Sequence, residues 1–385
     1  MKFRQLGRNV KLLRTRDRIV SVCILVISVS IVASGGASAQ LPPVQSPPGW
    51  GQVPQGTGAC SVGKSCADLA PGMIRGALGA SPVANNARAF AAILSSHTVA
   101  STANARAAEW AVEAFRRAGA DEVHIEKFGA SGQFENVVAE IRGRDKPQDY
   151  VLFVAVLGDP GTDSLLAAEK AAVLIDAVRV IHNTGNIPRR SIRFVLFVAA
   201  PARSRSKDAH LAGVWAYVRA HRAHLERIAA AVSLGQARGA IDGFSLEARA
   251  DTIAAVRQAF VPLRSLGIRN FTQLVRIPSA TTPFWLEGIP TLVATRAKAP
   301  PNQAAHGSPK TQPAEISSAV LRGLKRRVAV AAVAAYALAD AETRIGPRQS
   351  RAKVEESITS MKLMPKLRRS ADVAEWKSVD ALNPN

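Results

Sequence analysis

The sequence predicts an α/β protein built on a mainly parallel β-sheet. Tyr150–Leu157 is entirely apolar and Ile192–Ala199 nearly so, and both runs are rich in β-branched and aromatic residues. Such runs are typical of strands buried on both faces of a parallel sheet. Between them, Leu165–His182 has the length and apolar content of a buried helix. Because strands that alternate with long helices are joined by crossover connections, we expect these strands to lie parallel.

The chain before these runs shows the same alternation. Helical periodicity begins near Asn85, and Ser101–Ala118 carries an apolar stripe that ends at Gly119, where a helix stop is expected. Val123–Phe128 and Glu135–Ile141 follow as predicted strands, joined by a turn rich in glycine.

Further elements follow the second apolar run. They are a helix at Asp208–Ala220, strands at Ile228–Leu234 and Thr291–Thr295, and a long helix at Glu315–Glu342 that closes the sheet. After about Gly346 the chain turns polar and basic. We therefore expect residues 346–385 to form a weakly ordered tail.

Residues 1–39 have the pattern of a secretory signal peptide. A basic segment precedes the apolar run Ile19–Ala33, and Ala37-Ser38-Ala39 fits a small-residue cleavage site. A retained membrane anchor is the alternative, but about 15 apolar residues are too few to span a bilayer comfortably. We expect export to the periplasm or the extracellular space, a mature chain from Gln40, and no stable membrane span after cleavage.

Residues 40–84 form a lead-in rich in Pro and Gly that we expect to be loosely ordered. It holds Cys60 and Cys66, the two cysteines that remain after Cys23 leaves with the signal peptide. In an oxidising compartment they predict a disulfide that closes a small loop. A metal pair is the alternative, although CSVGKSC lacks tight ligand spacing and a second ligand pair nearby.

The chain carries a formal net charge of +21. A basic surface can serve nucleic acid, anionic lipid or an acidic envelope polymer. The basic residues are mostly scattered arginines without the interleaved aromatic residues that stack on bases, so we predict no nucleic-acid partner. The clusters Arg203–Lys207 and Lys325–Arg327 are interpreted as solvated faces.

Six segments occur in the order and at the spacing of a known family. They are Asn104–Phe128, Glu135–Gly143, Ala171–Ile181, Arg189–Phe197, Ala212–Leu234 and Pro283–Arg296. Together they resemble the secreted di-zinc exopeptidases, which include bacterial leucyl aminopeptidases and plasma glutamate carboxypeptidase. The resemblance implies that residues 85–345 form a three-layer α/β/α sandwich with a mixed, mainly parallel central sheet. It also implies two zinc ions at the strand ends.

That family uses five metal ligands and one general base. Most of the positions implied by the resemblance hold residues that bind no metal: Val156 and Gly158 for a His-x-Asp pair, Leu166 for the bridging Asp, Ala200 and Pro201 for a Glu-Glu pair, Gly235 for the next carboxylate, and Ser279–Thr281 for a Ser-Asp-His motif. Only His306 matches the last ligand. A three-residue insertion would let Asp163 replace Leu166, so the register there stays open.

Two remnant ligands, Asp163 and His306, are too few for a stable zinc site, which normally has three protein ligands and a water. No carboxylate stands at Ala200-Pro201 to act as the base. Charged side chains crowded at the strand ends would be costly to bury without a metal, so small apolar replacements are physically coherent. We therefore predict no catalytic residue and expect no cofactor. His306 is then either a remnant ligand or a loop histidine bonded to backbone.

Other constellations leave alternatives open. His221 and His224 could form a transition-metal pair or lie as solvent-exposed imidazoles at a helix C-terminus. Asp159 and Asp163 could be functional acids or ordinary turn residues. The mature chain has no Gly-x-Ser-x-Gly elbow, no Gly-rich phosphate loop after a strand and no His-Glu-x-x-His motif.

Three functional hypotheses follow. The first is an exported, catalytically inactive peptidase homologue that binds a peptide or an envelope component. The second is an active zinc-dependent exopeptidase with a rearranged site built from Asp159, Asp163 and His306. The third is an adaptor whose basic surface docks on anionic lipid or wall polymer, with binding that salt weakens.

Overall fold

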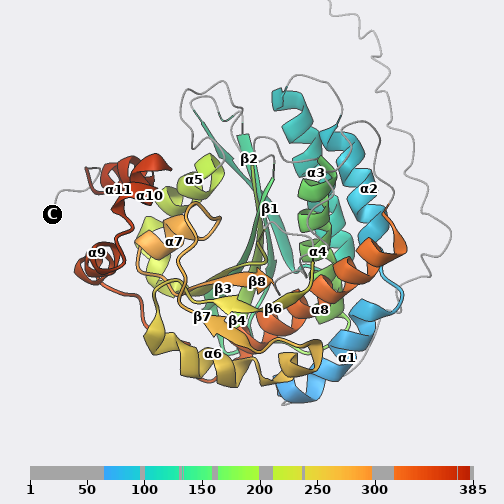
Figure 1. Ribbon diagram of the computed structural model, residues 1–385. Helices are drawn as coiled ribbons and strands as arrows, with labels where there is room; N and C mark the ends of the chain where they lie inside the picture. Colours follow the sequence, from blue (N-terminus) through green and yellow to red (C-terminus); the bar gives the residue numbers. More distant parts are fainter. Residues whose placement is uncertain are drawn as a thin grey trace, which may run out of the picture. The chain divides into compact units, whose positions relative to one another are not determined.

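One β-sheet organises the part of the chain that the computed structural model describes. Its strands are β1 (Glu122–Phe128), β2 (Phe134–Ile141), β3 (Lys146–Leu157), β4 (Arg190–Val198), β5 (Ile228–Ser233), β6 (Ile241–Ser245), β7 (Asn270–Thr272) and β8 (Thr291–Arg296). The eight strands are ordered β1-β2-β4-β3-β5-β8-β6-β7 (Figure 1). The described residues are 65–95, 100–129, 132, 134–157, 164–198, 211–235, 239–296, 316–370 and 372–381. They all belong to the unit Gly56–Asn385.

The sheet is mixed with a parallel centre, as predicted. β4, β3, β5 and β8 run parallel to one another. At one side β2 is antiparallel to β4, and β1 is antiparallel to β2. At the other side β6 is antiparallel to β8 and pairs in parallel with β7. The carboxyl ends of the four central strands therefore meet at one edge, where ligands bind in open α/β sheets.

The two faces of β3 pack into two separate cores. Val151 and Phe153 belong to the first core, and Leu152 and Val154 belong to the second. Because successive side chains of a strand alternate between faces, a strand covered on both sides must be apolar throughout. This confirms the interpretation of Tyr150–Leu157 and the three-layer α/β/α arrangement.

Five helices cover the first face of the sheet: α1 (Cys66–Leu78), α2 (Val83–Leu94), α3 (Ala100–Ala118), α4 (Ser164–His182) and α8 (Ser318–Asp340) (Figure 1). α4 and α8 contact each other at the centre of this layer. Both are rich in fully buried alanines, such as Ala171 and Ala335. Small side chains let two helices approach closely. α6 (Ile253–Ala259) adds Val256 to the same core.

The second face is covered by α5 (Ala212–Ala220), α7 (Thr282–Leu286), α9 (Arg351–Ser360), α10 (Met364–Arg369) and α11 (Asp372–Ala381) (Figure 1). Two large side chains, Trp215 of α5 and Trp285 of α7, are almost completely buried in this layer. They pack in the same cluster as Phe197 of β4. The sheet is therefore enclosed on both faces.

Residues 65–82 differ from the loosely ordered lead-in that we expected. Ser65 and Asp68 form a capping box, in which each side chain accepts a hydrogen bond from the backbone of the other at the start of α1. Leu69 and Met73 are buried in the first core, and α1 contacts α8. α1 is thus an integral part of the first helical layer.

The predicted disulfide between Cys60 and Cys66 is wrong, because Cys66 is a free cysteine. Its Sγ lies 3.8 Å from the carbonyl oxygen of Val333 in α8. Burial, together with the nearby Asp340, raises the pKa of the thiol to about 12. A thiol that stays protonated is a poor nucleophile and a poor metal ligand, so the alternative of a metal pair gains no support either. Cys60 lies outside the described residues.

The C-terminal segment also differs from the weakly ordered tail that we expected. Between Arg351 and Ala381 it forms α9, α10 and α11. Val354, Leu367 and Trp376 are buried in the second core. The segment is therefore part of the sandwich, and most of its charged side chains lie on the outside of the helices.

The predictions that concern export stay predictions. The signal-like segment at residues 1–39 and most of the lead-in lie outside the described residues. Among the helices that the structure does describe, none is both long and apolar enough to cross a membrane.

Candidate functional site

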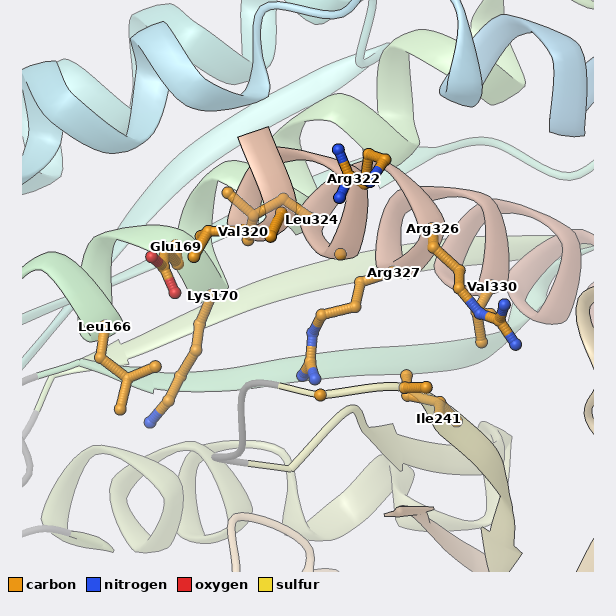
Figure 2. Close-up of a pocket in the computed structure, with 14 residues that line it drawn as sticks. Leu166, Glu169, Lys170, Ile241, Val320, Arg322, Leu324, Arg326, Arg327 and Val330 are labelled. Atoms are coloured by element: carbon orange, nitrogen blue, oxygen red, sulfur yellow. The ribbon is translucent and has the colours of Figure 1, made fainter. Parts of the chain in front are cut away.

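A pocket of about 410 Å³ lies between α4, α8 and the start of β6 (Figure 2). Its lining is mostly apolar but contains five charged side chains: Glu169, Lys170, Arg322, Arg326 and Arg327. Lys170 and Arg327 also contact backbone at the carboxyl ends of two central strands. We call this cavity the strand-end pocket, because it occupies the edge of the sheet where ligands of α/β proteins bind.

Arg327 of α8 contacts the end of β5. Its Nη2 donates hydrogen bonds to the carbonyl oxygens of Leu234, at 2.7 Å, and Gly235, at 3.4 Å. Burial lowers the pKa of the guanidinium to about 10, although the negative charge of Glu169 opposes the shift. The side chain is therefore cationic at neutral pH, and a positive charge stands where β5 ends.

Lys170 of α4 contacts the end of β3 in the same way. Its Nζ lies 3.4 Å from the carbonyl oxygen of Val156. Backbone carbonyls at strand ends need partners once the strand pairing stops. Because β3 and β5 are paired neighbours, Lys170 and Arg327 bring two cations from different helices to adjacent strand ends.

Three of the positions where the resemblance implied a lost ligand line this pocket or contact a residue that lines it. Val156 has a buried side chain and contacts Lys170 through its carbonyl, while Leu166 lines the pocket. Gly235 has a φ of 67°, which suits glycine, and contacts Arg327. The remaining candidate positions lie outside the described residues: Gly158, Asp159, Asp163, Ala200, Pro201 and His306.

The cluster Lys325–Arg327 is not the solvated face that we expected. Each of its side chains donates to a backbone carbonyl of another element. Lys325 bonds Gly79 after α1, Arg326 bonds Leu266, and Arg327 bonds Leu234. The cluster thus connects α8 to three neighbours, because long basic side chains extend across apolar surface to reach polar groups.

Solved structures with the same fold are known. A peptidase M28 precursor from Shewanella amazonensis SB2B aligns with a TM-score of 0.58 at 13% identity, covering 74% of this chain and 99% of that chain. The LapA aminopeptidase of Legionella pneumophila aligns with a TM-score of 0.51 at 13% identity, covering 72% of this chain and 76% of that chain. No protein-family model matches the chain, and no curated protein does. The fold is zinc-exopeptidase-like.

At 13% identity the likeness establishes the fold, and the chemistry must be inferred from this chain's own residues. A zinc-exopeptidase-like fold implies zinc at the strand ends, but the described residues there do not fit it. Val156, Leu166 and Gly235 have no side-chain donor atom. Nowhere in the described part of the chain do three His, Cys, Asp or Glu side chains gather as a metal site requires. Lys170 and Arg327 would also repel a dication.

His221 is neither the exposed imidazole nor the metal partner of His224 that the sequence left open. Its Nε2 lies 2.8 Å from Oε1 of Glu126, and its ring stacks on Tyr217 with centroids 4.1 Å apart. Glu126 belongs to β1 and His221 follows α5 directly. This pair therefore holds the end of α5 against the sheet.

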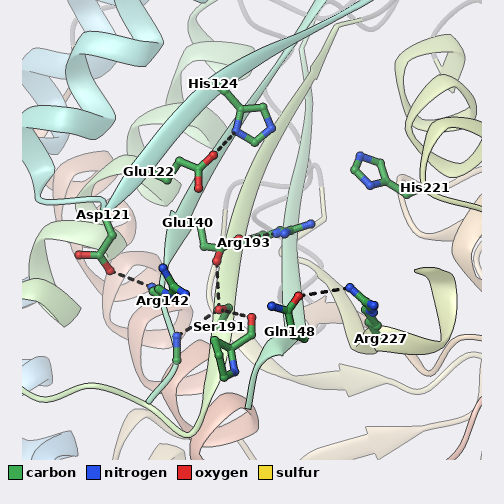
Figure 3. Close-up of polar contacts among 12 residues, drawn as sticks. Asp121, Glu122, His124, Glu140, Arg142, Gln148, Ser191, Arg193, His221 and Arg227 are labelled. Atoms are coloured by element: carbon green, nitrogen blue, oxygen red, sulfur yellow. Dashed lines mark hydrogen bonds and ion pairs between the residues drawn. The ribbon is translucent and has the colours of Figure 1, made fainter. Parts of the chain in front are cut away.

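Glu126 lies at the centre of a polar network under α5. Burial alone would raise its pKa, but hydrogen bonds from His124 and His221 lower the pKa to about 2. The contact with Glu126 in turn raises the pKa of His124. Beside them, Nε of Arg193 lies 2.6 Å from Oε2 of Glu140 (Figure 3). The network is a structural link between α5 and the strands β1, β2 and β4.

A second cavity, of about 280 Å³, adjoins this network near the start of β3. Arg193 and Glu140 line it and are paired with each other. The carboxylate of Asp121, which also lines it, accepts a hydrogen bond from the backbone N–H of Arg142 (Figure 3). This cavity is smaller than the strand-end pocket and lies near the start of β3, not at the carboxyl ends of the parallel strands, so it is the weaker candidate.

Glu247, which follows β6, is a buried acid that the sequence analysis missed. Its Oε2 accepts a hydrogen bond of 2.9 Å from the hydroxyl of Thr281, and its Oε1 accepts one of 3.3 Å from the N–H of Arg276. Burial raises the pKa of Glu247 to about 7 in spite of these bonds. Thr281 belongs to Ser279–Thr281, where the resemblance implied a supporting motif. The hydrogen bond with Glu247 therefore holds this segment next to the end of β6. The sequence contained no distinct signal for this role, because the stretch 241–247 also contains the acidic residue Asp242.

Proposed function

We propose that this chain is a non-catalytic protein with a peptidase-like fold that binds a ligand in the strand-end pocket. The observation that carries the proposal is the pair Lys170 and Arg327, whose cations contact the carbonyl groups that end β3 and β5. A metallopeptidase needs carboxylate and imidazole ligands at such a site. Of the described residues, Lys170 and Arg327 contact these two strand ends through their side chains, and both are positively charged.

The pocket itself supports a binding role. Small-molecule sites are concave, mostly apolar and about 300–1,000 Å³ in volume, with a few polar groups that orient the ligand. The strand-end pocket, at about 410 Å³, has this size and composition. We propose that the ligand is a peptide or a component of the cell envelope, and that the protein acts outside the cytoplasm, as the signal-like pattern of residues 1–39 indicates.

Zinc content and peptidase turnover, measured on one preparation of the full chain, test the proposal. After incubation with excess zinc and removal of free metal, the protein should retain less than about one equivalent, because the resemblance leaves two candidate ligands, Asp163 and His306, where three are usual. Release of chromophore from an aminoacyl p-nitroanilide should equal the rate in buffer. Elemental analysis and absorbance report the two quantities independently.

A rearranged metallopeptidase predicts the reverse. Two tightly bound zinc ions, together with turnover that a chelator blocks, would contradict the non-catalytic proposal. That turnover should then disappear in His306→Ala. The matched control is His224→Ala, which removes an exposed imidazole outside the strand-end pocket.

A further inference from the structure

Basic side chains outnumber acidic ones among the described residues that line the strand-end pocket. Lys170, Arg322, Arg326 and Arg327 are basic, and within the described part of the chain Glu169 is the one acidic residue of the lining. The basic residues come from two helices, α4 and α8, that face each other across the cavity. An excess of positive charge next to apolar surface favours an anionic ligand.

Apolar side chains from three elements complete the lining. Leu166 belongs to α4, Ile241 begins β6, and Val320, Leu324 and Val330 belong to α8. Figure 2 shows Lys170 and Arg327 extending from the two helices toward the strands, with Leu166 beside Lys170 and Ile241 beyond Arg327. A ligand that fills this space therefore meets both a cationic end and an apolar wall.

Arg326 adds a polar group without a partner. Its Nη2 bonds the carbonyl oxygen of Leu266, but its Nε is buried and has no hydrogen-bond partner within the described residues. A buried donor left in this state is costly unless a ligand or water satisfies it. Arg326 is part of the pocket lining, and its guanidinium points away from Lys170 and Arg327 (Figure 2).

Gly323 shows that the cavity has room beside α8. A Cβ atom built at Gly323 meets no other atom within 4 Å. Glycine inside a helix is less favourable than alanine. A larger side chain at this position would enter the pocket, since Gly323 is part of its lining.

We propose that the strand-end pocket binds a small carboxylate that carries an apolar chain. The carboxylate lies near Lys170 and Arg327, and the chain packs on Leu166, Ile241 and Val320. This inference rests on the proposed binding function and specifies its ligand class. A fatty acid and a peptide with an apolar C-terminal residue share this chemistry, so the experiment includes both.

Calorimetric titration of the full chain with three decyl compounds tests the charge preference. Decanoate, used below its micellar concentration, should bind at least about tenfold more tightly than decyltrimethylammonium or decanol, because its head group gains charge-assisted hydrogen bonds. Equal affinity for the three compounds would overturn the proposal. N-acetyl-Leu-Leu and its C-terminal amide form the peptide arm, in which only the free acid should bind.

Decanoate affinities of pocket variants test whether the ligand binds in the strand-end pocket. Lys170→Met should weaken decanoate binding about tenfold, and Lys170→Arg should restore most of it. Lys366→Met, which removes an exposed cation from α10, is the matched control and should change nothing. Gly323→Trp should weaken binding about tenfold or more by filling the cavity, whereas Gly323→Ala should bind as the wild type does. Binding that is unchanged in both Lys170→Met and Gly323→Trp would place the ligand elsewhere and refute the proposal.

The zinc measurement separates this inference from the proposed function. Bound zinc with chelator-sensitive turnover would refute the non-catalytic function even if decanoate binds. Absence of decanoate and peptide binding in a zinc-free, inactive protein would refute only the ligand class proposed here.

Discussion

Trp376→Ala should lower the free energy of unfolding by about 3–5 kcal/mol, the usual cost of truncating a buried aromatic side chain. The indole of Trp376 in α11 is 4% exposed and packs in the second core. The guanidinium of Arg351 in α9 lies 3.9 Å from the centroid of its ring. The substitution therefore removes both apolar contact and a cation–π interaction between two C-terminal helices. Urea unfolding followed by circular dichroism measures the effect.

Lys377→Ala is the matched control, because this neighbouring side chain is exposed. Surface changes of this kind usually stay within about 0.5 kcal/mol. A loss below about 1 kcal/mol for Trp376→Ala would mean that the C-terminal helices contribute little to the fold.

The same helices are held by a buried polar contact. Nε1 of Trp215 in α5 donates to Oδ1 of Asp372 at 3.1 Å, and the hydroxyl of Ser370 donates to Oδ2 at 2.5 Å. The N-terminus of α11 is therefore tied to the layer that covers the second face of the sheet. This contact helps to hold α11 against the second face of the sheet.

Glu247→Gln should raise the free energy of unfolding at pH 8 by up to about 3 kcal/mol relative to the wild type, with little effect at pH 4.5. Burial raises the folded-state pKa of Glu247 from 4.5 to about 7. The folded chain therefore keeps this proton where the unfolded chain has lost it. Its stability falls as pH rises from about 4.5 to 7 and then stays level, because both states are ionised above that range. Because glutamine does not ionise, the variant does not lose this stability as the pH rises.

Unfolding titrations of the wild type and Glu247→Gln at several pH values between 4.5 and 8 check this prediction. Glu355→Gln, which neutralises an exposed carboxylate in α9, controls for the change in net charge. A stability difference that does not vary with pH would show that folding leaves the pKa of Glu247 at its ordinary value. The hydrogen bonds from Thr281 and Arg276 would then fully offset its burial.

The central elements were predictable because burial on both sides leaves a clear pattern. β3 and β4 appear in the sequence as apolar runs, and α4 begins and ends within one residue of its predicted bounds. Burial from two sides permits almost no polar residue, so such segments can be recognised without a partner. The resemblance then supplied the order of the layers, which composition alone does not give.

α1 and the C-terminal helices were not predictable in the same way. Pro71, Gly72 and Gly76 weaken the helical signal of α1, and α9 to α11 expose polar residues on most of their surface. Each buries only a few side chains, such as Met73 or Leu367, against layers formed by distant segments. Tertiary packing overrides local propensity here.

The sequence by itself predicted six of the eight described strands and the central helices. That Val156, Leu166 and Gly235 stand where metal ligands were lost remains a prediction from the resemblance. Only the tertiary structure decided what stands in their place. Lys170 and Arg327 contact carbonyl oxygens 14 and 93 residues away in the chain, at Val156 and Leu234. In the sequence they are ordinary basic residues of two helices. Their role depends on how those helices pack on the strand ends, which no local pattern encodes.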